Sequence, residues 1–263
     1  MLPISADTFP VSSEELTAAL ERGFGSGGVK PVTIAAEGAY PQLAKLSVDL
    51  SGVQLTRDDR LHGFSGSSAG TVTIGRLEMF GEPLYFEKAP VNARLEGETV
   101  EMKVTGEPKV GSLMLESAGK GTVSILVTIE ALEGLLQSLA GEAAAKQGIE
   151  VKKTKLTLHQ EGPRAVSFRA EVTAKVFIMS AALALTGRLE IDDEFNARLS
   201  SLGLDGDAMV TNLAGSFLKP RLQQLEGKAF PLFAFLPGGI KLRDIQVSVA
   251  PALHVQARFG NGV

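Results

Sequence analysis

The chain has 263 residues, of which 44% are hydrophobic and 21% are charged, and its formal net charge is −4. A chain of this size buries a substantial core as one or two domains. The net negative charge argues against a general nucleic-acid-binding protein, which needs a basic face. The absence of cysteine excludes disulfides, thiolate metal sites and cysteine nucleophiles. Because only 6% of the residues are aromatic, the interior must be mainly aliphatic.

The first predicted element is a short amphipathic helix that begins after Ser12. Ser12 and Glu15 have the spacing of a capping box, in which the serine oxygen accepts a hydrogen bond from a first-turn amide. Leu16, Ala19 and Leu20 then share one face of the helix, as a buried face requires.

Most of the remaining chain alternates between apolar and polar residues, which is typical of strands buried on one face. The clearest examples lie in residues 46–50, 95–104 and 166–172. Segments rich in glycine or containing proline predict the breaks and connections. They are residues 23–28, 63–70, 81–83, 106–108 and 161–163, with a further break at Gly97. No alternation of strands with helices indicates a parallel sheet, so we expect a mostly antiparallel one.

Two further amphipathic helices are expected in the second half of the chain. One begins near Thr128 and carries leucines at three- and four-residue spacing as far as Gly148, a residue suited to a left-handed cap. The other begins near Asp207, is kinked or broken near Pro220 and ends near Gly227. Both helices present a broad apolar face.

A partial repeat follows these two helices. Gly148-Ile149 and Gly239-Ile240 each open a Gly-Ile-x-aliphatic-basic strand, and a second strand follows in both copies. The repeating unit is then a helix followed by a β-hairpin. Convergence explains the pattern equally well, because glycine after a helix and alternation within a strand are both common.

Four segments, taken in order, are similar to a known family: residues 46–55, 121–132, 185–191 and 236–247. Together they resemble the LmeA-like phospholipid-binding family (DUF2993), which is related to the TULIP lipid-binding proteins. The resemblance covers about residues 40–259 and rests on aliphatic, glycine and basic positions. It implies an α+β fold in which a strongly curved, mostly antiparallel sheet is wrapped around long amphipathic helices and encloses an apolar groove.

We accordingly expect a single lipid-binding domain over residues 1–263. Its N-terminal part, residues 1–28, is a helix with a glycine-rich loop; residues 29–127 are β-rich; and residues 128–263 contain two helix-plus-hairpin units.

Two segments are expected to line the groove. Residues 176–185 are apolar on both faces of a strand, and the helix expected after Asp207 has a wider apolar face than one-sided packing requires. The predicted lipid-binding residues are Phe177, Ile178, Met179, Leu213, Phe217 and Leu218. The alternative for residues 176–185 is an ordinary central strand that is buried on both faces.

Another segment is expected to touch a membrane. Residues 230–237 contain three phenylalanines and two prolines, within a segment, 219–258, that has six basic and two acidic residues. Aromatic rings enter the membrane interface while basic side chains meet anionic headgroups. The predicted contact residues are Phe230, Phe233, Phe235, Lys228, Lys241 and Arg243. A loop folded over the core as a lid is an equally good interpretation.

No catalytic or metal-binding pattern stands out. Ser68 lies in a G-x-S-x-G sequence, but a nucleophile elbow leads into a helix, whereas a strand is expected here. His62, His159 and His254 lack metal-ligand spacing, and the acidic residues 192–194 predict a solvated turn rather than a calcium loop. We therefore expect no enzyme activity, no cofactor and no metal.

The leading functional hypothesis is the binding and transfer of a lipid or another apolar ligand in a hydrophobic groove. Its expected partners are that ligand and an anionic membrane surface, with no nucleic acid. The alternative is a non-catalytic structural or adaptor protein with a self-filled core, and a serine hydrolase that uses Ser68 with His62 ranks third. The chain shows no signal peptide and no run of about 18 apolar residues, so we expect a cytoplasmic or peripheral membrane location.

Overall fold

The computed structural model of the chain describes residues 1–26, 28, 31–55, 68–145, 149–176, 179–206, 220, 222–231 and 242–261. The chain divides into two compact units. Unit 1 comprises Met1–Leu126, Phe233–Asp244 and Gln256–Val263, and unit 2 comprises Val127–Leu232 and Ile245–Val255. Our expectation of a single domain over residues 1–263 stays a prediction.

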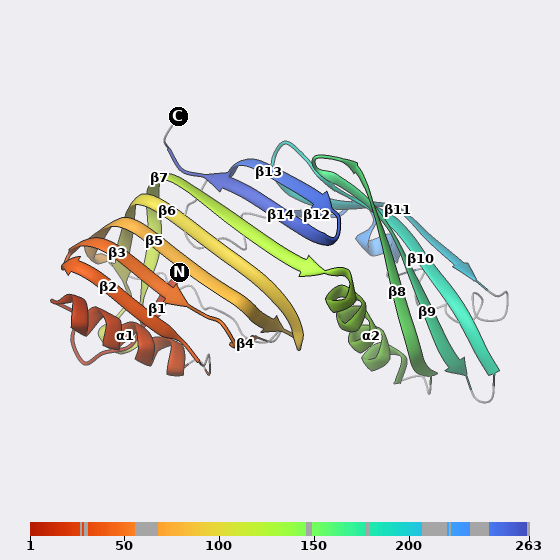
Figure 1. Cartoon of the computed structure of the whole chain (residues 1–263), viewed down its shortest axis with the longest axis horizontal. Coiled ribbons are helices and arrows are strands. Elements are labelled where there is room, and N and C mark those ends of the chain that lie inside the picture. The colour runs from red at the N-terminus through yellow and green to blue at the C-terminus, as the bar shows by residue number, and fades with distance from the viewer. Residues whose placement is uncertain are drawn as a thin grey trace. The chain divides into compact units, whose positions relative to one another are not determined.

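Unit 1 contains most of a nine-stranded mixed sheet (Figure 1). The strands of this sheet are β1 (Leu2–Ile4), β2 (Thr33–Ala39), β3 (Gln42–Asp49), β4 (Gln54–Leu55), β5 (Ser68–Phe86), β6 (Ala89–Thr105), β7 (Gly111–Thr128), β13 (Leu242–Val249) and β14 (Ala252–Phe259). Residues 127–128 of β7, 245–249 of β13 and 252–255 of β14 are assigned to unit 2. Their order is β13-β14-β7-β6-β5-β3-β2, with β1 paired to β7 and β4 paired to β5. β3 and β4 run parallel to β5, whereas β5, β6 and β7 pair antiparallel.

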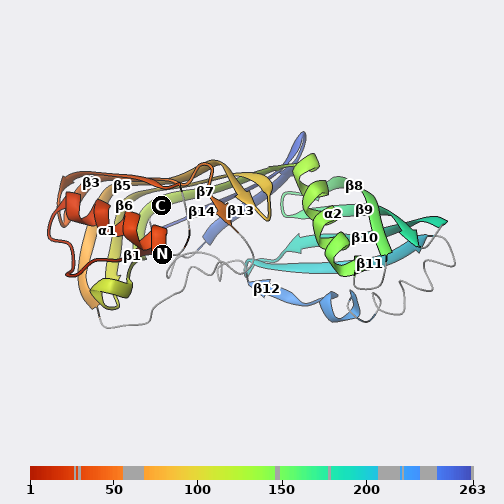
Figure 2. The same ribbon diagram turned by 90° about the horizontal axis from the view of Figure 1, so that it is seen from below.

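Helix α1 (Ser13–Ser26) packs against β1 and β2 and closes the core of unit 1 (Figures 1 and 2). The predicted cap is confirmed, because the Ser12 hydroxyl accepts a hydrogen bond from the Glu15 N–H at 3.2 Å. Leu16 and Leu20 are both fully buried in this core. Since burying a leucine contributes roughly 1.5–3 kcal/mol, this face holds the helix on the sheet.

The glycine-rich loop predicted at residues 23–28 is wrong in its first part, because α1 continues through Gly23 and Gly25 to Ser26. A Cβ atom at Gly23 would lie 2.3 Å from the carbonyl oxygen of Pro3. Glycine therefore lets the helix approach β1 closely. This packing outweighs the helix propensity of glycine, which is about 1 kcal/mol poorer than that of alanine.

Unit 2 is built on a five-stranded antiparallel sheet in the order β12-β11-β10-β9-β8. Its strands are β8 (Ile149–Gly162), β9 (Ala165–Val176), β10 (Met179–Ile191), β11 (Asn196–Gly206) and β12 (Ala229–Pro231). Helix α2 (Ile129–Ala145) packs against β8 (Figure 1). The Thr128 hydroxyl accepts a hydrogen bond from the Ala131 N–H at 3.2 Å, which confirms the helix start predicted near Thr128.

The fold expected from the family resemblance, a strongly curved sheet wrapped around long helices, is wrong. The described residues instead form a mixed sheet and a second, antiparallel sheet. Of the helices with described bounds, α1 has 14 residues, α2 has 17, and the 3-10 turn η1 (Pro108–Val110) has 3. Residues 220 and 222–225 are also helical. None of these described helices is enclosed by a sheet. The physical reason is that alternation specifies the face of a strand but not the strand that pairs with it.

Some expected breaks lie inside continuous strands. β5 passes through residues 81–83 with a register shift between Gly81 and Leu84, where a bulge takes up the additional residues. β6 likewise continues through Gly97. The connections predicted at residues 106–108 and 161–163 are confirmed, since η1 follows Glu107 and a turn joins β8 to β9. The presence of glycine or proline in the sequence therefore does not distinguish a bulge within a strand from a turn between strands.

Candidate functional site

The sheet of unit 2 has one aliphatic face and one polar face. Its register places Leu156, Ala170 and Leu185 side by side on one face. The neighbouring residues Lys155 and Glu171 point to the opposite face, because successive side chains of a strand alternate. The large side chains of the aliphatic face include Leu156, Leu158, Val166, Phe168, Val172, Leu183, Leu185, Leu189, Leu199 and Leu204.

Much of this aliphatic face is only half-buried. Leu156 and Val166 are buried, with exposed fractions of 8% and 4%. By contrast, Leu183, Leu185 and Leu204 on β10 and β11 remain half-buried. Fully burying such a side chain contributes about 1.5–3 kcal/mol, of which a half-buried leucine gains only part. The sheet therefore retains apolar surface that a ligand can cover.

Helix α2 adds a second, partly exposed apolar surface. Its half-buried leucines are Leu132, Leu135, Leu136 and Leu139. Two polar side chains fix the helix to the edge of β8. The Glu133 carboxylate accepts a hydrogen bond from the Leu156 N–H at 2.8 Å, and the Gln137 amide donates one to the Lys152 carbonyl at 3.4 Å. These bonds satisfy backbone groups that a strand at the edge of a sheet leaves open.

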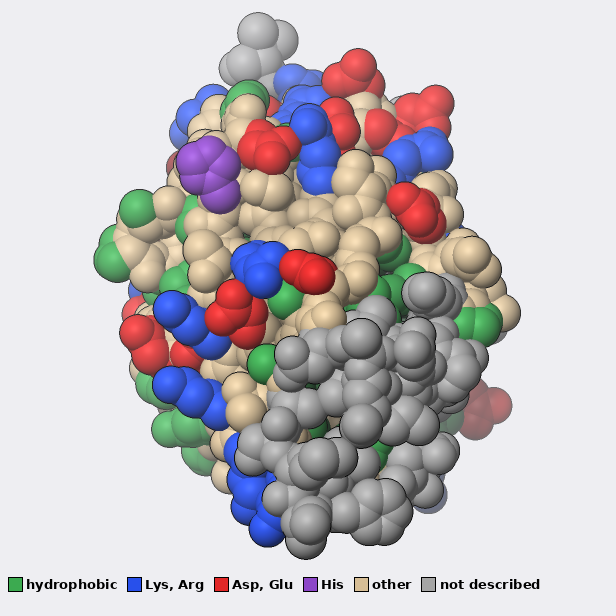
Figure 3. Space-filling model, turned by 90° about the vertical axis from the view of Figure 1, so that its right-hand side faces the viewer, with side chains coloured by type: hydrophobic (Ala, Val, Ile, Leu, Met, Phe, Trp, Pro, Cys, Tyr) green, Lys and Arg blue, Asp and Glu red, His purple; other side chains and the backbone are tan. Residues whose placement is uncertain are grey.

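The opposite face of the unit 2 sheet carries ion pairs. Arg169 pairs with Glu171 at 2.9 Å, and Arg188 pairs with Glu161 at 2.8 Å. Figure 3 shows basic and acidic side chains intermingled over the described part of the surface that it draws. Exposed pairs of this kind contribute about 0–1 kcal/mol each. They make this face suited to water rather than to an apolar ligand.

Most residues that the sequence predicts for the lipid and membrane sites lie outside the described residues. This applies to Phe177, Ile178, Leu213, Phe217, Leu218, Phe233, Phe235 and Lys241. Met179 begins β10 and Phe230 lies in β12, but their side chains are not described. Lys228, in unit 2, and Arg243, in unit 1, are exposed. Both sets therefore stay predictions.

Sequence reasoning placed Leu183 and Leu185 in the segment 176–185 that is expected to line the groove, but named neither them nor any leucine of β11 as a lipid-binding residue. Their signal was present, because Leu183, Leu185 and Leu189 alternate with other residues along one strand. The alternation along one strand does not show which strands lie next to it. Only the register aligns Leu185 with Leu204 and so extends the aliphatic face across β10 and β11.

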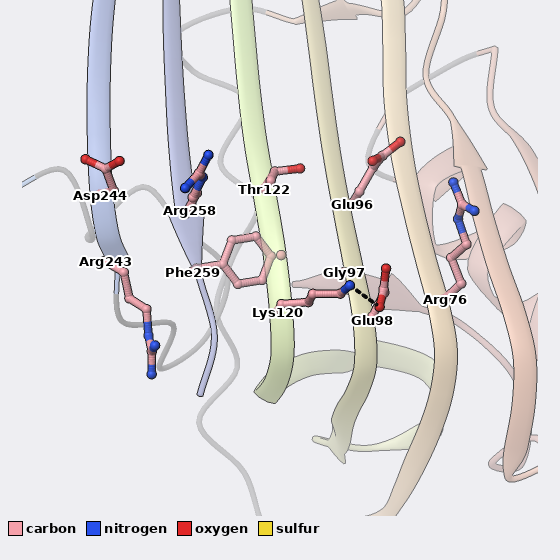
Figure 4. Close-up of a pocket in the computed structure, with 11 residues that line it drawn as sticks. Arg76, Glu96, Gly97, Glu98, Lys120, Thr122, Arg243, Asp244, Arg258 and Phe259 are labelled. Carbon is pink, nitrogen blue, oxygen red and sulfur yellow. Dashed lines mark ion pairs between the residues drawn. The ribbon is translucent and has the colours of Figure 1, made fainter. Parts of the chain in front are cut away.

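Unit 1 has a polar cleft of about 610 Å³ on its sheet (Figure 4). It is lined by Arg76, Glu96, Gly97, Glu98, Lys120, Gly121, Thr122, Arg243, Asp244, Arg258 and Phe259. Lys120 of β7 pairs with Glu98 of β6 at 2.9 Å. Arg76 pairs with Glu78 at 2.6 Å. Because these charges largely offset one another, the cleft does not favour a ligand of one sign.

The described residues contain no group of three or more side chains that could hold a metal ion. Ser68 is the first residue of β5, although it lies in the break predicted over residues 63–70, and His62 lies outside the described residues. Among the helices described, none combines the length and apolar character needed to cross a membrane.

Comparisons with family models, with curated proteins and with solved structures find no match to this chain. The resemblance to the LmeA-like family therefore stays a prediction.

Proposed function

We propose that this protein binds a lipid, or another ligand with an aliphatic chain, on the aliphatic face of the unit 2 sheet. The observation that carries the proposal is the half-buried state of Leu183, Leu185 and Leu204, which lie on paired strands within this sheet. Leucines on such strands normally pack against a covering layer. An acyl chain would complete that layer, with about 0.8 kcal/mol for each methylene group that it buries.

The lining favours a flexible hydrocarbon chain over a planar ring. Phe168 is the one aromatic side chain among the described residues of the aliphatic face, and its ring lies over Gly187. Aromatic ligands prefer stacking partners, which leucine and valine do not offer. Binding of a chain by leucines needs no catalytic group.

Exchange of the ligand at an anionic membrane is the second part of the proposal. It rests on the three phenylalanines of residues 230–237 and on the basic residues near them in the sequence.

The test compares Leu183→Gln with Ala182→Gln. Leu183 belongs to the aliphatic face, whereas its neighbour Ala182 is exposed on the polar face. We expect dodecanoic acid, measured by displacement of a fluorescent fatty acid, to bind about tenfold more weakly to Leu183→Gln, because losing one leucine contact costs on the order of 1.4 kcal/mol. Ala182→Gln should bind like the wild type, and circular dichroism should show both variants folded.

Native mass spectrometry of the wild type, with organic extraction of bound molecules, is an independent test of ligand binding. We expect chain-bearing molecules to co-purify with the protein. Absence of such molecules, together with no binding of dodecanoic acid by the wild type, would contradict the proposal and favour the adaptor alternative with its self-filled core.

A further inference from the structure

Thr154 places a polar hydroxyl on the aliphatic face of the unit 2 sheet. It lies on β8 opposite Val172 and two residues before Leu156, so its side chain belongs to the aliphatic side. Thr154 is only 4% exposed, and its hydroxyl has no hydrogen-bond partner among the residues that the structure describes. A buried hydroxyl left without a partner destabilises the folded protein, because it loses its hydrogen bonds to water without replacing them. Valine has the same branched shape and would fill the position without that cost.

The polar side chains that α2 directs at β8 are already engaged. Glu133 accepts the hydrogen bond of the Leu156 N–H at 2.8 Å, and Gln137 donates to the Lys152 carbonyl at 3.4 Å. These two backbone groups lie on either side of Thr154 along the strand. Across the sheet, Val172 offers only methyl groups. The side chains nearest to Thr154 in this register therefore leave its hydroxyl without an acceptor.

We infer that the Thr154 hydroxyl is the polar anchor of the ligand and donates a hydrogen bond to an acyl oxygen at the head of its aliphatic chain. This inference rests on the proposed function and specifies the ligand as an amphiphile with a carboxyl or ester carbonyl group. The hydroxyl is closed to solvent in this structure, so binding of the acyl head requires the side chains that cover Thr154 to move aside.

The test measures three ligands of equal chain length on the wild type and on Thr154→Val. The ligands are dodecanoic acid, methyl dodecanoate and dodecane, each in competition with a fluorescent fatty acid. We expect Thr154→Val to bind the acid and the ester about fivefold more weakly, which corresponds to losing about 1 kcal/mol of hydrogen bonding. Binding of dodecane should not change. A loss for the acid alone would identify a free fatty acid, and an equal loss for acid and ester would identify the acyl oxygen that esterified lipids share.

Thr157→Val is the matched control, because Thr157 lies on the same strand but is exposed on the polar face. It should bind all three ligands like the wild type. Ligand-free Thr154→Val should unfold at a urea concentration equal to or above that of the wild type, since no internal hydrogen bond is lost.

Two results would overturn the inference while leaving the proposed function intact. One is wild-type binding of all three ligands with no selective loss in Thr154→Val. The other is a lower urea midpoint for ligand-free Thr154→Val, which would reveal an internal partner for the hydroxyl. Failure of the wild type to bind any of the three ligands would instead remove the proposed function and the inference with it.

Discussion

At the scale of single residues, the turn between β10 and β11 is organised by Asp192. Its carboxylate accepts hydrogen bonds from the backbone N–H groups of Asn196 at 2.9 Å and Glu194 at 3.0 Å, and from the Arg198 guanidinium at 2.9 Å. These donors lower the pKa of Asp192 from 3.8 to about 2, and the backbone N–H of Asn196 has the largest effect. The acidic residues 192–194 therefore form a turn, as their sequence predicts.

This shift makes the stability of the protein depend on pH. Because the pKa of Asp192 is lower in the folded state than in the unfolded state, the unfolded chain binds more protons between pH 4 and 2. The contribution of Asp192 is thus fully present above about pH 4 and is lost as the pH falls through about 2. In Asp192→Asn, this part of the pH dependence should disappear from urea unfolding curves.

Nuclear magnetic resonance titration of the Asp192 carboxyl carbon tests the cause of the shift. Arg198→Gln should raise the pKa of Asp192 only part of the way to 3.8, since the backbone donors remain. A wild-type Asp192 that titrates at its ordinary value would contradict the assignment.

At the scale of elements, α2 protects the edge of β8. Leu156 is buried, so its N–H needs an acceptor other than water, and Glu133 supplies it. The contact also explains how a helix whose leucines are only half-buried stays on the strand.

Glu133→Ala should therefore destabilise the protein by about 1–3 kcal/mol, because it leaves the buried Leu156 N–H without a partner. Hydrogen exchange of the Leu156 amide should become faster in the same variant. Glu133→Gln is the matched control, since its amide oxygen still accepts the bond and most of the stability should return. Unchanged exchange at Leu156 in Glu133→Ala would show that the hydrogen bond contributes nothing.

At the scale of the whole molecule, the two units differ in how completely they are packed. The buried hydrophobic cluster belongs to unit 1 and includes Leu46, Leu77 and Met102, which are at most 2% exposed. In unit 2, Leu183 and Leu185 remain half-buried. Local stability follows the density of buried apolar contacts.

Amide hydrogen exchange should consequently be slower in β5 and β6 of unit 1 than in β10 and β11 of unit 2. Addition of dodecanoic acid should slow exchange in β10 and β11 and leave β5 and β6 unchanged, because a ligand stabilises the residues that it covers. Equal protection of all four strands without ligand would contradict this difference between the units.

Local features of the fold follow from the sequence. The Ser12 cap, the start of α2 at Thr128 and the alternation in residues 166–172 are confirmed, with Val166 and Ala170 buried and Arg169 exposed. These features depend on residues that lie within about one helical turn, or two strand positions, of one another. The aliphatic character of the candidate site was likewise predictable from composition.

Contacts between distant segments were decided by the tertiary structure. Gly97 and Gly121 pair across β6 and β7, and a Cβ at Gly121 would lie 2.2 Å from the Phe259 ring, so glycine here makes room for a side chain from the end of the chain. The parallel pairing of β3 with β5 also has no local signal in the sequence, nor does the lack of a partner for the Thr154 hydroxyl among the described residues. The alternation in the sequence determined which side chains share a face of a strand. Strand pairing and helix packing determined which of those side chains remain uncovered, because burial depends on segments that only folding brings together.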